Sequence, residues 1–111
     1  MVNLKEICLN YFDRFEAKDI SALEVIFSGN VSLQDWEIQT VGKEAVLAAY
    51  KTIFAQAHTI QVSPQHIYQE GRTVIAELEI VIDNTSTPLK VIDVIVFDES
   101  NRICAIRAYR G

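Results

Sequence analysis

Apolar residues recur three and four positions apart in three segments of the chain, a spacing typical of amphipathic helices. It predicts helices over residues 3–17, 20–27 and 43–56. In the first segment the apolar positions are Leu4, Ile7, Cys8, Tyr11, Phe12 and Phe15. Gly29 follows the second segment and is expected to terminate that helix, because glycine favours helix ends.

After the second helix the pattern becomes the alternation of apolar and polar residues that is typical of strands. Residues 31–42 predict two short strands around Asp35 and Trp36. Turn sequences separate four further predicted strands, over residues 59–69, 72–83, 88–98 and 102–110. This order predicts one α+β domain over residues 1–111, with three N-terminal helices packed on one face of a strongly bent, mainly antiparallel sheet.

The predicted strand over residues 88–98 carries a carboxylate among apolar residues. Successive residues of a strand point to opposite faces, so Asp93 shares its face with four apolar side chains. These are Leu89, Val91, Ile95 and Phe97. An isolated charge is costly in a dry interior, so Asp93 is expected to be paired, protonated through a raised pKa, or exposed to a cavity.

The opposite face of the same strand is apolar as well, with Ile92, Val94 and Val96. One face of the sheet covers the helices, so the other is expected to meet a second copy of the chain. The pattern therefore predicts a homodimer that forms through the outer face of the sheet.

Composition narrows the range of partners. The chain has 111 residues and is 50% apolar, which is enough for one domain with a substantial core. A net charge of −5, without a cluster of Lys or Arg, argues against nucleic acid and against membrane surfaces as partners. The apolar stretches are far shorter than the roughly 20 residues that cross a bilayer. With no signal-peptide core at the N-terminus, the expected location is the cytoplasm.

Neither the thiols nor the imidazoles predict a bound cofactor. Cys8 and Cys104 fall inside predicted elements and are interpreted as buried free thiols. His58 and His66 lack the spacing of a metal site with each other or with a cysteine. We therefore expect no metal and no other cofactor.

The order of elements resembles the nuclear transport factor 2-like superfamily, and the SnoaL-like and ketosteroid isomerase branches are the most similar in length. Three stretches carry the resemblance, which covers nearly the whole chain: NYFDRFEAKDISALEVIFSGNVSLQDW, VGKEAVLAAY and VIDVIVFDESNRICAIRAY. It implies a cone-shaped, cystatin-like roll, in which three helices and a bent sheet surround an apolar pocket.

The resemblance to ketosteroid isomerase implies specific roles for three residues. That enzyme has a tyrosine on the first helix, an aspartate at the end of the first strand and an aspartate on the penultimate strand, which fall on Tyr11, Asp35 and Asp93. A protonated Asp93 and Tyr11 would stabilise an enolate oxyanion, while an ionised Asp35 would move a proton between carbons. We therefore expect Tyr11 and Asp93 within hydrogen-bonding distance, or one water apart, in one cavity with Asp35 across it.

Seven further positions are expected to contact the ligand of this pocket. They are Trp36, Ala49, Leu78, Ile80, Ile106, Ala108 and Arg110. Three of them depart from the isomerase pattern, because Trp36 replaces a proline, Ala49 a phenylalanine and Arg110 an apolar residue. These departures argue against a flat steroid, so the expected ligand is another small apolar molecule with a carbonyl group.

The residues leave three functional classes open. The first is a cofactor-independent isomerase that acts by proton transfer. The second is a module that binds a small ligand without changing it, with Asp93 and Tyr11 joining helix to sheet and Asp35 serving as a turn residue. The third is an assembly module that uses the outer sheet face.

Overall fold

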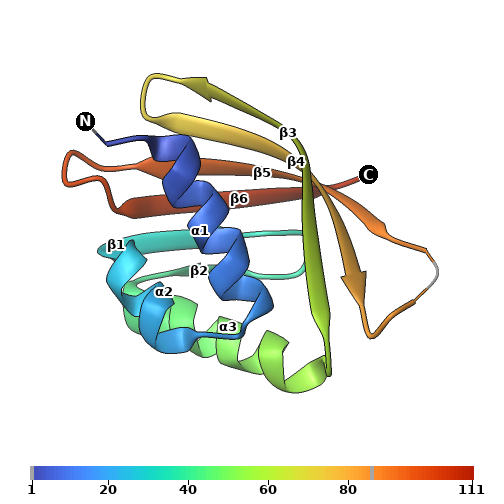
Figure 1. Cartoon of the computed structure of the whole chain (residues 1–111). Helices are drawn as coiled ribbons and strands as arrows, with labels where there is room; N and C mark the ends of the chain where they lie inside the picture. The colour runs from blue at the N-terminus through green and yellow to red at the C-terminus, as the bar shows by residue number, and fades with distance from the viewer. Residues whose placement is uncertain (1, 86) are drawn as a thin grey trace.

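Helices and strands follow the predicted order in the computed structural model, which describes residues 2–85 and 87–111 (Figure 1). The helices are α1 (Leu4–Glu16), α2 (Ile20–Ile26) and α3 (Lys43–Gln56). The strands are β1 (Phe27–Gln34), β2 (Gln39–Val41), β3 (Ile60–Glu70), β4 (Thr73–Ile82), β5 (Leu89–Phe97) and β6 (Ile103–Arg110). They form one sheet in the order β2-β1-β6-β5-β4-β3, in which the β1–β6 pair is parallel and the other pairs are antiparallel.

The predicted α+β architecture is confirmed, because the three helices pack on one side of a curled, mostly antiparallel sheet (Figure 1). Register shifts in β1, in β3 and in the β5–β6 pair interrupt the regular ladders, and such irregularities bend and twist a sheet. At the end of α1, the carboxylate of Glu16 accepts a hydrogen bond of 3.0 Å from the backbone N–H of Val62 in β3. This contact joins the first helix to the far edge strand.

The inner face of the sheet buries alternate side chains of β4 and β5, and β5 has the side-chain parity that the sequence predicts. Val74, Ala76 and Leu78 of β4 are buried, and Ile95 and Asp93 of β5 are buried beside them. Ile92 points to the other side and is 43% exposed. The carboxylate of β5 therefore faces the helices.

The boundary between α2 and β1 differs from the prediction. Gly29 does not terminate the helix, since α2 ends at Ile26 and Gly29 lies within β1. Phe27 takes extended backbone angles, pairs with Ile103 of β6 and is fully buried. Burial of this large side chain together with sheet pairing outweighs the local preference of glycine for a helix end.

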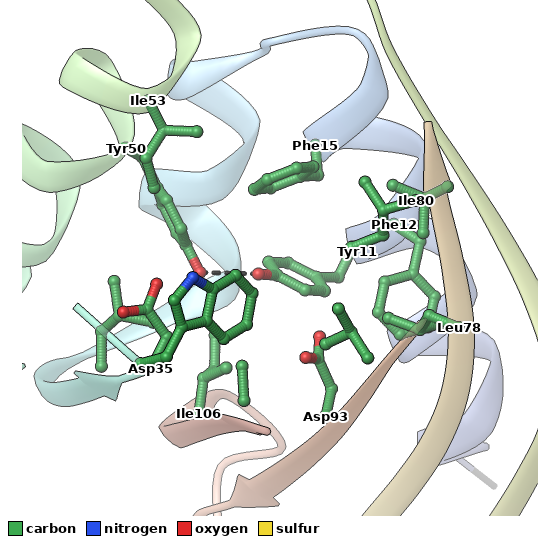
Figure 2. Close-up of a pocket in the computed structure, with 15 residues that line it drawn as sticks. Tyr11, Phe12, Phe15, Asp35, Tyr50, Ile53, Leu78, Ile80, Asp93 and Ile106 are labelled. Carbon is green, nitrogen blue, oxygen red and sulfur yellow. Dashed lines mark hydrogen bonds between the residues drawn. The ribbon is translucent and has the colours of Figure 1, made fainter. Parts of the chain in front are cut away.

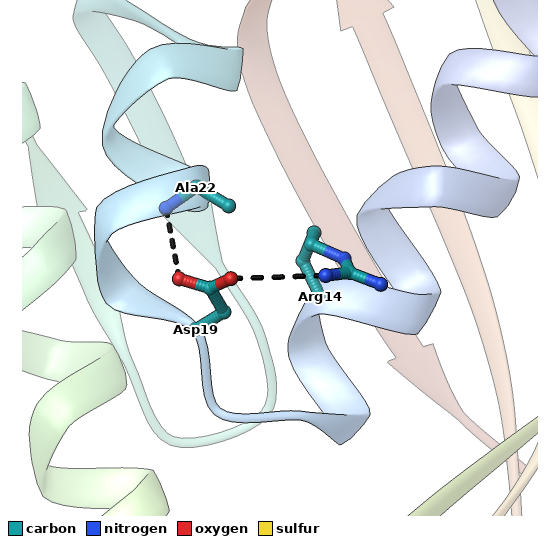
Figure 3. Close-up of polar contacts among 3 residues, drawn as sticks. All are labelled: Arg14, Asp19 and Ala22. Carbon is teal, nitrogen blue, oxygen red and sulfur yellow. Dashed lines mark hydrogen bonds and ion pairs between the residues drawn. The ribbon is translucent and has the colours of Figure 1, made fainter.

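A polar cluster fixes the connection between α1 and α2 (Figure 3). Asp19 accepts a hydrogen bond of 3.1 Å from the backbone N–H of Ala22 and thereby caps α2. Its second carboxylate oxygen lies 3.7 Å from the guanidinium of Arg14. Because both side chains are partly exposed, the cap is expected to contribute more stability than the ion pair.

Among the described residues, no helix is both long enough and apolar enough to cross a membrane.

Replacing the cap residue tests this connection. Asp19→Ala is expected to lower the free energy of unfolding by about 1 kcal/mol, because the N–H groups at the start of α2 lose their acceptor. Asp19→Asn keeps the cap and removes the charge, so it should lose less than half as much. Urea unfolding of both variants measures the difference, and an equal loss would mean that the ion pair dominates.

Candidate functional site

A small cavity lies between α1, α3 and the inner face of the sheet (Figure 2). Its volume is about 80 Å³, and most of its wall is apolar. The apolar lining comes from Phe12, Phe15, Leu33, Trp36, Ile53, Val62, Leu78, Ile80, Val91, Ile106 and Ala108. Four polar side chains complete the wall, namely Tyr11, Tyr50, Asp35 and Asp93. The chemistry of the site therefore rests on two phenols and two carboxyl groups.

The two phenols are hydrogen-bonded to each other. The hydroxyl of Tyr11 on α1 lies 2.6 Å from the hydroxyl of Tyr50 on α3 (Figure 2). Both side chains are buried, which raises their pKa values well above the usual range and keeps them protonated at neutral pH. One hydroxyl donates to the other, so one proton of the pair remains free to be donated to a third group.

Tyr11 has a hydrogen-bond partner that was not expected. Among the described residues its hydroxyl bonds to Tyr50, and no direct hydrogen bond joins it to Asp93, although both side chains line the cavity. The sequence pattern alone gave Tyr50 no role in the site. A buried tyrosine hydroxyl normally needs a polar partner, and that requirement is the signal that marks Tyr50 as part of the site.

Asp93 lies on β5 with its carboxyl group in the cavity and is only 8% exposed. Burial raises its pKa to about 7, and the nearby charge of Asp35 adds to the rise. The group is therefore a carboxylic acid in a large fraction of molecules at neutral pH. In that form it is a hydrogen-bond donor that faces an apolar space.

Asp35 follows β1 directly and is only partly buried. Its Oδ1 accepts hydrogen bonds of 2.7 Å from the N–H of Glu37 and 2.6 Å from the N–H of Ile38. These bonds hold the turn between β1 and β2. Oδ2 makes no hydrogen bond within the described part of the chain, and the side chain also lines the cavity. Asp35 is thus a turn residue that also presents a carboxylate to the site.

Five of the seven other expected positions line the same cavity: Trp36, Leu78, Ile80, Ile106 and Ala108. Ala49 and Arg110 do not. Ala49 precedes Tyr50 on α3, so its side chain lies about 100° around the helix from that of Tyr50. Arg110 ends β6, where its guanidinium reaches solvent and stands 5.9 Å above the ring of Trp36.

A wider hollow, which we call the outer hollow, adjoins the cavity and has a volume of about 580 Å³. Ala49 lines this space. Five residues line both spaces: Phe15, Asp35, Trp36, Ile53 and Ile80. The cavity and the outer hollow therefore share a boundary.

The other reactive side chains lie outside this arrangement. Cys8 is fully buried, and burial raises the pKa of its thiol to about 12, so it is protonated and a poor nucleophile. Cys104 is partly buried, and both thiols are free. Within residues 2–85 and 87–111, no three His, Cys, Asp or Glu side chains lie together in a way that suits a metal ion.

An α+β cone that encloses a mostly apolar cavity defines the nuclear transport factor 2-like class. Within that class, the sequence profile of the SnoaL-like domain matches residues 9–106. The chain therefore belongs to the SnoaL-like domain family. A comparison with curated protein sequences gave no match.

Solved structures share this fold at low sequence identity. A proposed isomerase of the SnoaL-like family from Agrobacterium tumefaciens has a TM-score of 0.84 at 12% identity, over 96% of this chain and 95% of that one. The epoxide hydrolase/cyclase-like enzyme SalBIII, which has a role in pyran ring formation in salinomycin, scores 0.82 at 20% identity, over 97% and 90%. A nuclear transport factor 2-like protein from Cytophaga hutchinsonii scores 0.82 at 10% identity, over 100% and 92%.

Burial of Asp93 predicts a specific dependence of stability on pH. Because its pKa in the folded state lies above the usual value, protonation stabilises the fold below about pH 4, and that contribution is lost as the pH rises through about 7. From pH 4 to pH 9 the wild type should lose about 4 kcal/mol relative to Asp93→Asn. Urea unfolding at several pH values measures this difference.

Asp13→Asn is the matched control, because it removes an exposed carboxylate from the same domain. Its unfolding free energy should follow that of the wild type across the pH range. If the difference between wild type and Asp93→Asn stays constant with pH, Asp93 is not a buried titrating group.

Proposed function

We propose that the protein is a cofactor-independent acid–base enzyme that moves a proton within a small apolar carbonyl compound. One observation carries the proposal: a buried carboxylic acid and a hydrogen-bonded tyrosine pair face the same cavity as a partly exposed carboxylate. The environments of Asp93 and Asp35 differ in the way that separates an acid from a base. The description of one similar protein as an isomerase supports this class of reaction.

The proposed reaction gives each group one role. The Oδ2 atom of Asp35 takes a proton from the carbon next to the carbonyl, and the electrons of that C–H bond form an enolate. Tyr11, supported by Tyr50, and the protonated Asp93 donate hydrogen bonds to the enolate oxygen. Asp35 then returns the proton to another carbon of the conjugated system, so the product is an isomer and the enzyme is restored.

Loss of the base or of a donor should reduce turnover strongly. With a small β,γ-unsaturated ketone, Asp35→Asn is expected to abolish isomerisation, while the amide oxygen still holds the turn. Tyr11→Phe should lower kcat about 100- to 1000-fold, because one donor to the oxyanion is lost. The ultraviolet absorbance of the conjugated product measures the rate. Glu99→Gln, in the exposed turn after β5, is the control. If Asp35→Asn and Tyr11→Phe both turn over the ketone as fast as Glu99→Gln, these roles are contradicted.

The pH dependence of the reaction tests Asp93 separately. Catalysis needs Asp93 in its protonated form, so the rate should fall as the pH rises above about 7. Asp93→Asn keeps a donor that does not titrate, so its rate should be lower overall but should not fall between pH 7 and pH 9. A decline at the same pH in both proteins would assign the titration to another group.

A second candidate role, self-association, is favoured by the outer face of the sheet. Four large side chains of this face are 37–52% exposed: Tyr68, Ile75, Ile92 and Tyr109. Glu77 and Glu79 lie on the β4 side of this face, and Lys90 and Arg107 lie on the β5 and β6 side. A twofold axis along β5 would set the acidic side of one copy against the basic side of the other, so we propose a homodimer.

Solution scattering tests the dimer. The wild type is expected to have twice the mass of one chain, and Ile92→Lys should reduce this to a single chain, because a charge then lies within the apolar interface. Val25→Lys places the same charge on α2, at a side chain that is 70% exposed, and should leave the mass unchanged. If the wild type has the mass of one chain in solution, the proposed dimer is contradicted.

A further inference from the structure

We infer that the site takes a ligand in two parts, with a compact oxygen-bearing head in the cavity and an apolar arm in the outer hollow. The inference deepens the proposed function and rests on it for the chemistry of the head. The position of the arm rests on the shape of the two spaces alone. It also explains why Ala49, expected to contact ligand, lies outside the cavity.

The volume of the cavity limits the size of the head. A water molecule needs about 10–15 Å³ of such volume, so about 80 Å³ accommodates about five to eight non-hydrogen atoms. Sites for drug-sized ligands usually measure roughly 300–1,000 Å³. One small ring with its oxygen fits within the limit, whereas a fused four-ring skeleton exceeds it. A larger ligand must therefore extend beyond the cavity.

The outer hollow and the cavity share part of their walls. Phe15, Ile53 and Ile80 supply the apolar part of their shared boundary. Beyond it the hollow is lined by further apolar side chains, which are Ile38, Ala49, Ile60, Ile82 and Leu89. Most of these are only partly buried, so an apolar arm would remove their surfaces from water. Glu37, Thr52 and Gln56 add a polar portion to the wall.

Asp35 lies on the boundary between the two spaces. With the head oxygen near Tyr11 and Asp93, this position sets the carboxylate beside the carbons that connect head and arm. In a ketone whose arm begins at the carbon next to the carbonyl, this is the carbon from which the proposed reaction takes its proton. The two-part arrangement therefore orients the ligand for the base as well as binding it.

Ala49 and Ala48 offer a matched pair of positions on α3. Ala49 lines the outer hollow but not the cavity, so a larger side chain there should fill the space of the arm and leave the head site intact. Ala48 is exposed and lines neither space. The substitution made at Ala49 is therefore repeated at Ala48, as a control for any effect of a larger side chain on the stability of α3.

Phenol and its 4-ethyl, 4-butyl and 4-hexyl derivatives probe the two parts separately. Phenol has seven non-hydrogen atoms and matches the head, and its para position carries the arm. Trp36 is the only tryptophan of the chain and lines both spaces, so its fluorescence, excited at about 295 nm, reports binding. In the wild type, affinity should rise about fourfold for each methylene of the arm that becomes buried.

The variants locate the arm. Ala49→Phe should bind phenol as the wild type does but lose most of the gain from the alkyl chain, whereas Ala48→Phe should keep that gain. If Ala49→Phe does not fold, Ala49→Leu provides a smaller obstruction. In the wild type, the methyl NMR signals of Ile82 and Leu89 should shift with 4-butylphenol but not with phenol.

Three results would overturn the inference: no binding of any phenol, affinity that does not change with chain length, or an equal alkyl gain in the Ala49 and Ala48 variants. Failure of the proposed reaction gives a different result. If β,γ-unsaturated ketones that carry an alkyl arm bind with the same dependence on Ala49 but are not isomerised, the two-part site stands and the catalytic role is lost.

Discussion

Burial of the Asp93 carboxyl is the constraint on which the rest of the site depends. An ionised carboxylate in this cavity lacks the water that would stabilise it, so the surroundings favour the protonated acid. Every other polar group at the site is compatible with that state, because the buried phenols are neutral and the charged carboxylate of Asp35 is nearer to solvent. A cation placed beside Asp93 would favour its ionised form, so that Asp93 would no longer serve as the acid of the site.

The same constraint has a cost in stability. At a pH above the pKa of Asp93, ionisation in the folded state opposes folding by about 4 kcal/mol, a large part of the roughly 5–15 kcal/mol that stabilises a typical domain. The fully buried Leu23, Phe27, Ile95 and Ile103 provide compensating apolar burial in the core. Retention of a destabilising acid within this core agrees with a functional role for it.

Helix packing determines the geometry of the donors. Tyr11 and Tyr50 lie on different helices, 39 residues apart in sequence, and their 2.6 Å hydrogen bond joins α1 to α3 across the cavity. The hydrogen bond between Glu16 and Val62 of β3 joins the C-terminal end of α1 to the sheet. These contacts fix the positions of the helices that form the cavity walls. They favour a small, preformed cavity beside the outer hollow.

The sequence by itself determined the order of the elements and placed Asp93 on the same strand face as Val91 and Ile95, because these features follow from local periodicity. The resemblance to a known family, rather than periodicity, implied that this face lines a pocket with Leu78, Ile80 and Ile106. The tertiary structure alone decided the partner of Tyr11, since residues on separate helices meet only after both have packed on the sheet. It also decided that Ala49 lines the outer hollow and that Gly29 lies within a strand. Both outcomes depend on which neighbours are packed around a residue, and long-range packing of that kind has no local signal in the chain.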